Sequence, residues 1–397
     1  MKDIKSKERT VGFAVILFSL IALIAGFFIA RRSEPKEYNP YYTIEYELAR
    51  VKKVINNDYT VDEDSEHALR GSQSLDLELI TGRHKGERMP VMNYLGPMHE
   101  KLAKEGTVLT VMLTEDSREA GYQLSIVNYN YIRLYAALIA LFVIAVAIVG
   151  RWKGVKSLIA LVYSLLAIIL FLIPMWLKGY SAILITLITS VFIAAFGFTL
   201  IGGASKKTLA ALIGTLLCVL ISAGIAALAG AIAKVSGLTM EEAEWLLDES
   251  RTIENTTLNV RGLLVSGIII ASLGAVMDVA MSIASAVCEI NEVDSSLPVK
   301  RLFSSGMNIG RDMIGTMTNT LILAFMGSSL NLVIIMTASG MQFYQLLNNN
   351  DTMMEVIRSI AGSLGLVLAV PVTAFAAALL IKSAGKRGAG NEMAKQK

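Results

Sequence analysis

Long apolar stretches separated by short polar connections dominate the sequence. A helix needs about 20 apolar residues to cross a bilayer, and eight stretches approach or exceed that length. The pattern therefore predicts an α-helical polytopic membrane protein with about eight transmembrane helices. The predicted spans are Val11–Ala30, Leu134–Gly150, Ser157–Trp176, Ala182–Ile201, Leu209–Ala233, Gly262–Cys288, Met313–Ala338 and Ile360–Ile381.

One long polar segment, residues 33–132, lies between the first and second stretches and has a different period. Leu75, Leu77 and Leu79 alternate with polar residues, as in a strand with one buried face. The segment Gly82–Gly86 predicts a hairpin turn. About five such short strands predict a small all-β domain, an OB-like barrel, inserted after the first helix.

Lysine and arginine near the ends of the spans predict the orientation, because cytoplasmic loops carry an excess of these residues. Basic residues precede the first span and follow the last, so we expect both termini in the cytoplasm and residues 33–132 on the other side of the cell membrane. The expected parts are 1–32, the N-terminus and anchor; 33–132, the extracytoplasmic β domain; 133–382, a seven-helix membrane domain; and 383–397, a basic cytoplasmic tail.

Composition supports this interpretation and excludes several others. The chain is 54% apolar and 17% charged, whereas ordinary soluble domains are about 25% charged. A net charge of +3 gives no basis for nucleic-acid binding. Two cysteines cannot form a disulfide framework, and His67, His84 and His99 lack a metal-ligand spacing. We expect no metal and no cofactor.

The sixth span carries a small and polar stripe that includes an acid, Asp278. Spacings of three and four residues place the members of the stripe on one face of a helix. A carboxylate within the membrane is costly, so Asp278 needs a partner, a proton or water. The stripe consists of Gly267, Ala271, Gly274, Asp278, Ser282, Ser285 and Glu289.

The seventh span has a comparable polar face, followed by an interruption of its apolar run. Helix breaks at membrane depth are tolerated where they line protein or a water-filled cavity. The predicted solute or ion pathway comprises Asp278, Ser282, Ser285, Thr316, Asn319 and Thr320; its cytoplasmic mouth Glu289, Asn308, Arg311 and Asp312; and the helix break Gly327, Ser328, Ser329 and Asn331. The alternative is that these residues serve only in helix packing and interhelical hydrogen bonding.

Two features elsewhere predict packing and surface structure. In the fifth span Gly214, Cys218, Ser222, Ala226 and Gly230 form a small-residue ridge, which predicts close helix packing. After that span, the capping-box pattern at Thr239–Glu242 predicts a short amphipathic helix at the membrane surface.

Two long strings in the polar spans carry a family resemblance. The segments Gly274–Ser285 and Gly306–Leu321 resemble signatures of the YibE/YibF-like family of bacterial multi-pass membrane proteins. The order of anchor, outer domain and multi-span region is also similar to that of its longer members. The resemblance implies a permease without an assigned substrate, and it brings no catalytic residues.

The function expected from the sequence is therefore transport of an unidentified small solute or ion. The alternative is an envelope receptor or assembly factor whose β domain binds a protein partner. The bilayer is the one partner that hydropathy predicts directly, and a homo-oligomer is left open. We expect no enzyme, because protease, hydrolase and phosphate-loop motifs are missing. An intramembrane aspartyl protease needs two facing acids. The only candidates, Asp278 and Asp312, are predicted to lie at different depths.

Overall fold

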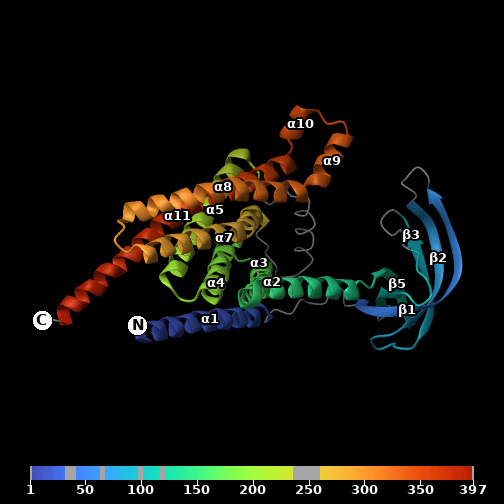
Figure 1. Cartoon of the computed structure of the whole chain (residues 1–397). Helices are drawn as coiled ribbons and strands as arrows, with labels where there is room; N and C mark the ends of the chain where they lie inside the picture. The colour runs from blue at the N-terminus through green and yellow to red at the C-terminus, as the bar shows by residue number, and fades with distance from the viewer. Residues whose placement is uncertain are drawn as a thin grey trace. The chain divides into compact units, whose positions relative to one another are not determined.

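A computed structural model describes residues 2–31, 42–62, 68–96, 102–116, 121–235 and 260–395 (Figure 1). The chain forms two compact units, one of residues 35–146 and one of residues 1–34 with 147–397. The amphipathic helix expected after Thr239 lies outside the described residues, as do His67 and His99.

In the described ranges, the regular structure outside the sheet is helical. Six of them are long and apolar enough to cross a membrane, or seven if the bent pair α8 and α9 is one span. The helices are α1 (Lys2–Arg31), α2 (Ile132–Ala167), η1 (Ile168–Leu172), α3 (Ile173–Leu177), α4 (Ala182–Gly202), α5 (Lys206–Ala233), η3 (Val260–Gly262), α7 (Leu263–Val293), α8 (Val299–Ser328), α9 (Leu330–Ala338), α10 (Phe343–Leu347) and α11 (Asn350–Lys395).

The count of spans differs from the eight expected, and α2 accounts for part of the difference. The second and third predicted spans lie in one continuous run, Ile132–Leu177, of 46 residues. Inside this run two helices meet at a kink at Arg151, which has non-helical φ 47° and ψ −137°. The two apolar stretches therefore form separate helical segments joined without a loop.

Small side chains bring α5 and α11 into close contact. The expected ridge of α5 is confirmed as a packing surface, since all five of its residues are buried. A Cβ added at Gly214 would lie 2.1 Å from the hydroxyl oxygen of Thr373, and one added at Gly365 would lie 2.1 Å from that of Ser222. The Ser222 hydroxyl donates to the carbonyl of Ala361 at 2.6 Å. Close approach and a cross-helix hydrogen bond together hold this pair in an apolar setting.

The unit of residues 35–146 contains a five-stranded antiparallel sheet, an open half-barrel in the order β3-β2-β1-β4-β5. The predicted alternation is confirmed: Leu75, Leu77 and Leu79 are all buried. The ladder ends at β3 and β5, so the OB-like barrel stays a prediction. The strands are β1 (Tyr42–Asp62), β2 (Ala68–Leu79), β3 (Arg88–Leu95), β4 (Val108–Asp116) and β5 (Tyr122–Tyr129).

A buried amide network fixes the β2–β3 side of this sheet. The Gln73 side chain accepts from the amide of Asn93 at 3.1 Å and from the backbone N–H of Ala103 at 2.8 Å. It donates to the side chain of Asn57 at 2.8 Å. A buried amide is tolerated only when its donors and acceptors are paired, so Gln73 ties three separate segments to one another.

Replacement of Gly214 by alanine should destabilise the helical unit. The added methyl group would collide with the Thr373 side chain and backbone, and overpacking of this kind costs about 1–3 kcal/mol. The matched control is Gly224→Ala on the same helix, where an added Cβ meets nothing within 4 Å. Thermal unfolding of the full chain in detergent should show a lower midpoint for the first variant alone; equal midpoints would contradict the close-contact interpretation.

Candidate functional site

The α7 helix has one buried face and one narrow exposed face, and the polar stripe lies on the exposed one. Gly267, Ala271, Gly274, Asp278, Ser282 and Glu289 are exposed, and Ser285 is half-buried. The opposite face, which includes Val276, Ile283 and Val287, is fully buried against neighbouring helices. The spacing therefore groups these residues, and the packing turns them away from the core of the helical unit.

Asp278 occupies the middle of α7. It is fifteen residues from both Leu263 and Val293, the two ends of the helix, which is about 22 Å at a rise of 1.5 Å per residue. Within the described part of the chain, Asp278 has neither a hydrogen-bond nor an ion-pair partner. A carboxylate so placed in an apolar helix needs a partner, a proton or water, and none of the residues that the structure describes supplies the partner.

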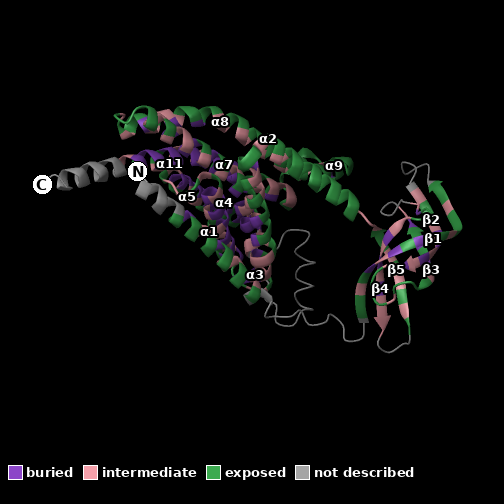
Figure 2. Ribbon diagram, turned by 60° about the horizontal axis from the view of Figure 1, so that its bottom comes forward, coloured by how far each residue is buried: buried purple, intermediate pink, exposed green. Residues whose placement is uncertain are grey.

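The α8 helix also turns its polar face outward, as the exposed colour along much of its length shows (Figure 2). Its buried residues are Leu302, Gly306 and Gly310. The hydroxyls of Thr316 and Thr320 donate to backbone carbonyls of their own helix at 3.1 Å and 2.9 Å. The exposed polar residues of α8 are Asn308, Arg311, Asp312, Thr316, Asn319 and Thr320.

Two close contacts fix the register of α8 against α7. A Cβ at Gly306 would lie 2.8 Å from Val287, and one at Gly310 would lie 3.0 Å from Ile283. Four residues forward on α8 thus correspond to four residues back on α7, as in an antiparallel pair. The same correspondence places Asp278 level with Gly315.

This register places Asp278, Arg311 and Asp312 near one depth. Asp312 is three residues from the level of Asp278, which is about 4.5 Å of axial rise. Arg311 lies level with Ser282, whereas Glu289 lies about two turns nearer the α7–α8 connection. Asn308 and Ser285 are level with one another. The two acids expected at different depths therefore lie about one turn apart.

The polar faces of α7 and α8 point outward in different directions. Helix α8 meets α7 at Ile283 and Val287, on the buried face of α7 opposite its stripe. It does so with Gly306 and Gly310, which also approach Ala374 and Val370 of α11 and lie opposite the polar side of α8. The two polar faces are therefore level in depth but are not brought together by the contact between the helices.

Arg311 does not form either ion pair expected for it. Its guanidinium donates to the side-chain oxygen of Asn308 at 3.1 Å, one turn away on α8. Among the described residues it makes no ion pair with Glu289 or Asp312.

The helix interruption lies at the expected position. The α8 helix ends at Ser328, Ser329 leaves helical geometry, and α9 begins at Leu330 with a bend of 53°. The hydroxyls of Ser328 and Ser329 both donate to the carbonyl of Phe325. Gly327, Ser328 and Asn331 are exposed, and Ser329 is half-buried. The backbone N–H of Ser329 donates to the same carbonyl at 3.1 Å, so the serine hydroxyls add to the hydrogen bond that ends the helix.

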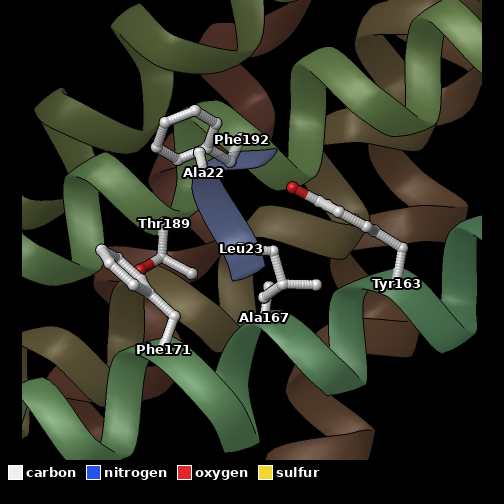
Figure 3. A pocket seen from close by; sticks show the side chains of 7 residues that line it. All are labelled: Ala22, Leu23, Tyr163, Ala167, Phe171, Thr189 and Phe192. Atoms are coloured by element: carbon white, nitrogen blue, oxygen red, sulfur yellow. The ribbon is translucent and has the colours of Figure 1, made fainter. Parts of the chain in front are cut away.

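The two pockets described next are not lined by the polar faces of α7 and α8. A pocket between α1, η1 and α4 has a volume of about 10 Å³, room for at most one water molecule. Figure 3 shows its lining: Ala22, Leu23, Tyr163, Ala167, Phe171, Thr189 and Phe192. A larger, open groove beside Pro371 is lined by apolar side chains of α5, α8 and α11. Neither offers charged or strongly polar ligands.

A cluster on the sheet was not predicted from the sequence. His84, in the β2–β3 turn, lies 3.1 Å from Glu87 and 3.0 Å from Glu115, and its ring stacks near Tyr122 at 4.2 Å. The three-residue spacing of His84 and Glu87 was the only local signal, because Glu115 comes from β4. No group of three or more potential metal ligands is found in the described ranges.

Hydrogen bonds in this cluster move the protonation equilibria of its members. Bonds to Glu115 and then Glu87 raise the pKa of His84. A bond from Tyr122 and one from His84 lower the pKa of Glu87. Burial, with the bond to Glu87, raises the pKa of Tyr122 to about 12.

The long apolar helices define a multi-span membrane protein with a separate β-sheet unit. The model of the YibE/F-like protein family matches residues 138–383, more than half of the chain, and the protein belongs to this family. Comparison with curated proteins and with solved structures gives no match.

His84 should titrate above its ordinary pKa of about 6.5. A raised folded-state pKa gives a stabilising contribution that is complete below about pH 6.5 and is lost as the pH rises through the folded value. NMR titration of ¹³C-histidine in the full chain should show this, with His84→Gln assigning the signal. Glu115→Gln should lower the value and Glu105→Gln should not; a pKa unmoved by Glu115→Gln would contradict the assignment.

Proposed function

We propose that the protein is a permease for a small solute or ion, with a pathway that uses the outward polar faces of α7 and α8. The observation that carries the proposal is the exposure of Asp278 in the middle of α7, level with the polar face of α8. We further propose a cell-membrane location, cytoplasmic termini and an extracytoplasmic sheet unit, which rest on the distribution of lysine and arginine.

The chemistry of the polar faces of α7 and α8 favours a cation or a proton donor. The carboxylate of Asp278 accepts hydrogen bonds or ligates a cation when ionised. Because the Thr316 and Thr320 hydroxyls donate to their own backbone, their free lone pairs are left as acceptors. The Asn319 carbonyl on α8 and the Ser282 hydroxyl on α7 add neutral ligands. The polar faces of these helices therefore present several oxygen acceptors.

The broken α8–α9 pair supplies the element that would move. Ser329 lies outside helical geometry and α9 departs at 53° from α8. Discontinuous helices in transporters expose backbone groups and change angle during alternating access. In this proposal, rotation about Ser329 opens or closes the pathway at the C-terminal end of α8, which is the end farthest from the α7–α8 connection.

An aspartyl-type enzyme is not proposed, although the two acids lie about one turn apart. Such a dyad requires two carboxylates that share one proton across a short hydrogen bond. No hydrogen bond joins Asp278 to Asp312 in the described residues. Single charges with separate neighbours suit binding or conduction better than peptide-bond hydrolysis.

Replacement of Asp278 by asparagine should strongly reduce transport. In proteoliposomes containing the full chain, dye-reported fluxes of H⁺, Na⁺ and K⁺ and a panel of small solutes should include at least one that depends on the protein. Asp278→Asn should reduce that flux at least about tenfold, since a transition-state contribution of 1.4 kcal/mol corresponds to this factor. Glu292→Gln, at the exposed end of α7, is the matched control. Unchanged flux in Asp278→Asn across the panel and several pH values would refute the mechanism.

A receptor or assembly factor is the second candidate, and exposed aromatic residues on the sheet favour it. Tyr46 and Tyr94, on β1 and β3, are 66% and 72% exposed. The sheet has its own hydrophobic core, so these side chains are not needed to fill it. Exposed tyrosines are typical anchors of protein interfaces.

Deletion of residues 36–128 separates the two candidates. A permease whose pathway uses the polar faces of α7 and α8 should keep its flux in proteoliposomes after this deletion. A receptor should lose complementation of a gene-deletion strain while the shortened chain remains stable in the membrane, and Tyr46→Ser with Tyr94→Ser should have the same effect. Full complementation by the deletion variant would exclude the receptor.

A further inference from the structure

We propose that the apolar groove beside Pro371 binds one acyl chain of an anionic phospholipid, whose phosphate is held by Lys206, Lys300 and Lys382 at the end of the groove. The site takes a lipid of the surrounding bilayer, so it is independent of the proposed permease and holds whether or not the chain conducts a solute. Four features carry it: the lining of the groove, its depth, the level of the three lysines and the helix ends beside them.

The groove is lined by apolar side chains of three helices. Helix α11 contacts both α5 and α8, and all three contribute to a groove with a volume of about 590 Å³. Phe303 of α8 and Phe375 of α11 line it as an edge-to-face pair with ring centroids 6.2 Å apart. Ligand sites of about 300–1,000 Å³ are common, and polar groups in them fix the orientation of the ligand. A lining without such groups suits a hydrocarbon chain.

The groove has the depth of one leaflet. Its lining on α11 extends from Pro371 to Leu380, and nine residues correspond to about 13.5 Å at a rise of 1.5 Å per residue. Lys382 follows two residues after Leu380. Half of a hydrocarbon core of about 30 Å is about 15 Å. A lipid tail that starts at the level of Lys382 would therefore end near the middle of the bilayer, at the far end of the groove.

The packing of α5 against α11 brings a second lysine to the level of Lys382. The two helices are antiparallel, and Gly214 of α5 is in close contact with Thr373 of α11. Lys206 lies eight residues before Gly214, so it is level with the position eight residues after Thr373. That position is one residue from Lys382, which is about 1.5 Å along the helix axis.

The packing of α8 against α11 adds a third lysine. Gly306 of α8 approaches Ala374, and Gly310 approaches the residue one turn earlier on α11, so this pair is antiparallel as well. Lys300 lies six residues before Gly306 and is level with the position six residues after Ala374. That position is two residues from Lys382, or about 3 Å along the axis. One lysine from each helix of the groove thus lies at its end.

Each of these lysines shares a helical face with a residue that lines the groove. Spacings of three and seven residues return to the same face of an α-helix. Such spacings join Lys206 to Ile213 on α5, Lys300 to Phe303 on α8, and Lys382 to Leu379 on α11. The ammonium groups are therefore on the groove side of their helices.

The three ammonium groups keep donors for a phosphate. Lys206 and Lys300 are exposed and, among the residues that the structure describes, take part in no hydrogen bond or ion pair. Lys382 donates to the backbone carbonyl of Ser295 at 2.6 Å. Because an ammonium group has three donors, this bond fixes the position of Lys382 and leaves two of its donors for a ligand.

Acids near this level compensate only part of the positive charge. Hydrogen bonds from Ser296 and, after them, the charge of Lys382 lower the pKa of Asp294, which keeps this one carboxylate ionised beside the lysine. Glu289 and Glu292 lie on the face of α7 opposite its contact with α8, so they point away from α8. Three lysines against one nearby aspartate leave the end of the groove positive.

Two helix N-termini add positive potential at the same level. Helix α5 begins at Lys206 and α8 at Val299, and the first turn of a helix carries unpaired N–H groups and the positive end of the helix dipole. Phosphate groups bind readily at such ends.

The headgroup decides which lipid binds. A lipid tail gains no hydrophobic free energy by exchanging other tails for the groove, because the bilayer is equally apolar. The lysines and helix ends therefore select by charge, and basic pockets between membrane helices favour anionic headgroups. In the orientation proposed above, the lipid belongs to the cytoplasmic leaflet.

Native mass spectrometry of the full chain tests the site. With equimolar phosphatidylglycerol and phosphatidylcholine in detergent, the wild-type chain should retain the anionic lipid at least about fivefold more often, a factor typical of one lysine near an anionic surface. Lys206→Gln with Lys300→Gln should abolish this preference. The matched control, Lys153→Gln with Lys156→Gln, removes two exposed lysines of α2 and should keep it.

A second pair of variants tests the groove itself. Ala376→Trp fills a position in the lining and should also reduce retention at least about fivefold, whereas Ala227→Trp, at an exposed position of α5, should not. Thermal midpoints of all variants report folding, and the lysine pair decides if Ala376→Trp is unfolded.

Four results would overturn the proposal. These are equal retention of the two lipids by the wild-type chain, a preference that survives in the double lysine variant, and the same loss in the α2 control. The fourth is full retention by a folded Ala376→Trp variant, since the headgroup would then bind without a tail in the groove. A dimer free of lipid would put a second copy in the groove and would count against the proposal as well.

Discussion

Close glycine-mediated packing around α11 is the constraint on which the helical unit depends. Gly214 of α5 meets Thr373, and Gly306 and Gly310 of α8 meet Ala374 and Val370. Hydrophobic burial does not drive such contacts in lipid, so close van der Waals packing must hold the helices together. Because α8 is seated against α11 and α7 at once, its register is fixed, and with it the depth of every polar residue on its outer face.

The sheet unit is held by a different balance of forces. Its core is a cluster of leucine and valine side chains from adjacent strands, where burial from water stabilises the fold directly. Polar anchors then fix its turns. Glu47 lies so close to Gly82, whose φ is +76°, that any side chain there would overlap the carboxylate. Gln73 and His84 join segments that are distant in sequence.

Much of the architecture followed from periodicity. Alternation of two residues placed the strands around Leu75–Leu79, and spacings of three and four grouped Asp278 with Ser282. The small ridge of α5 was identified as a packing surface for the same reason, since helical geometry decides which residues share a face. Hydropathy predicted two spans on either side of Arg151, and the structure has two helical segments there that meet at a kink without a loop.

The candidate site shows where sequence reasoning stopped. The polar faces of both helices were predicted correctly as faces, but their direction was not, because a pattern identifies a face without its neighbour. Depth was also misjudged. The position of Arg311 and Asp312 along the chain favoured a place near Glu289, whereas the contacts of Gly306 and Gly310 put them within about one turn of the depth of Asp278, on a different outward face. The contact of His84 with Glu115 depends on the pairing of strands distant in sequence, which local spacing does not predict.

The sequence by itself determined the membrane class, the alternation of strands and the presence of one acid on a small polar stripe. These depend on local periods and on the transfer energies of side chains, which can be read along the chain. Only the tertiary structure decided that the stripes of α7 and α8 lie level and face outward. Register and facing depend on contacts between helices, and those contacts are set by the shapes of residues far apart in the sequence.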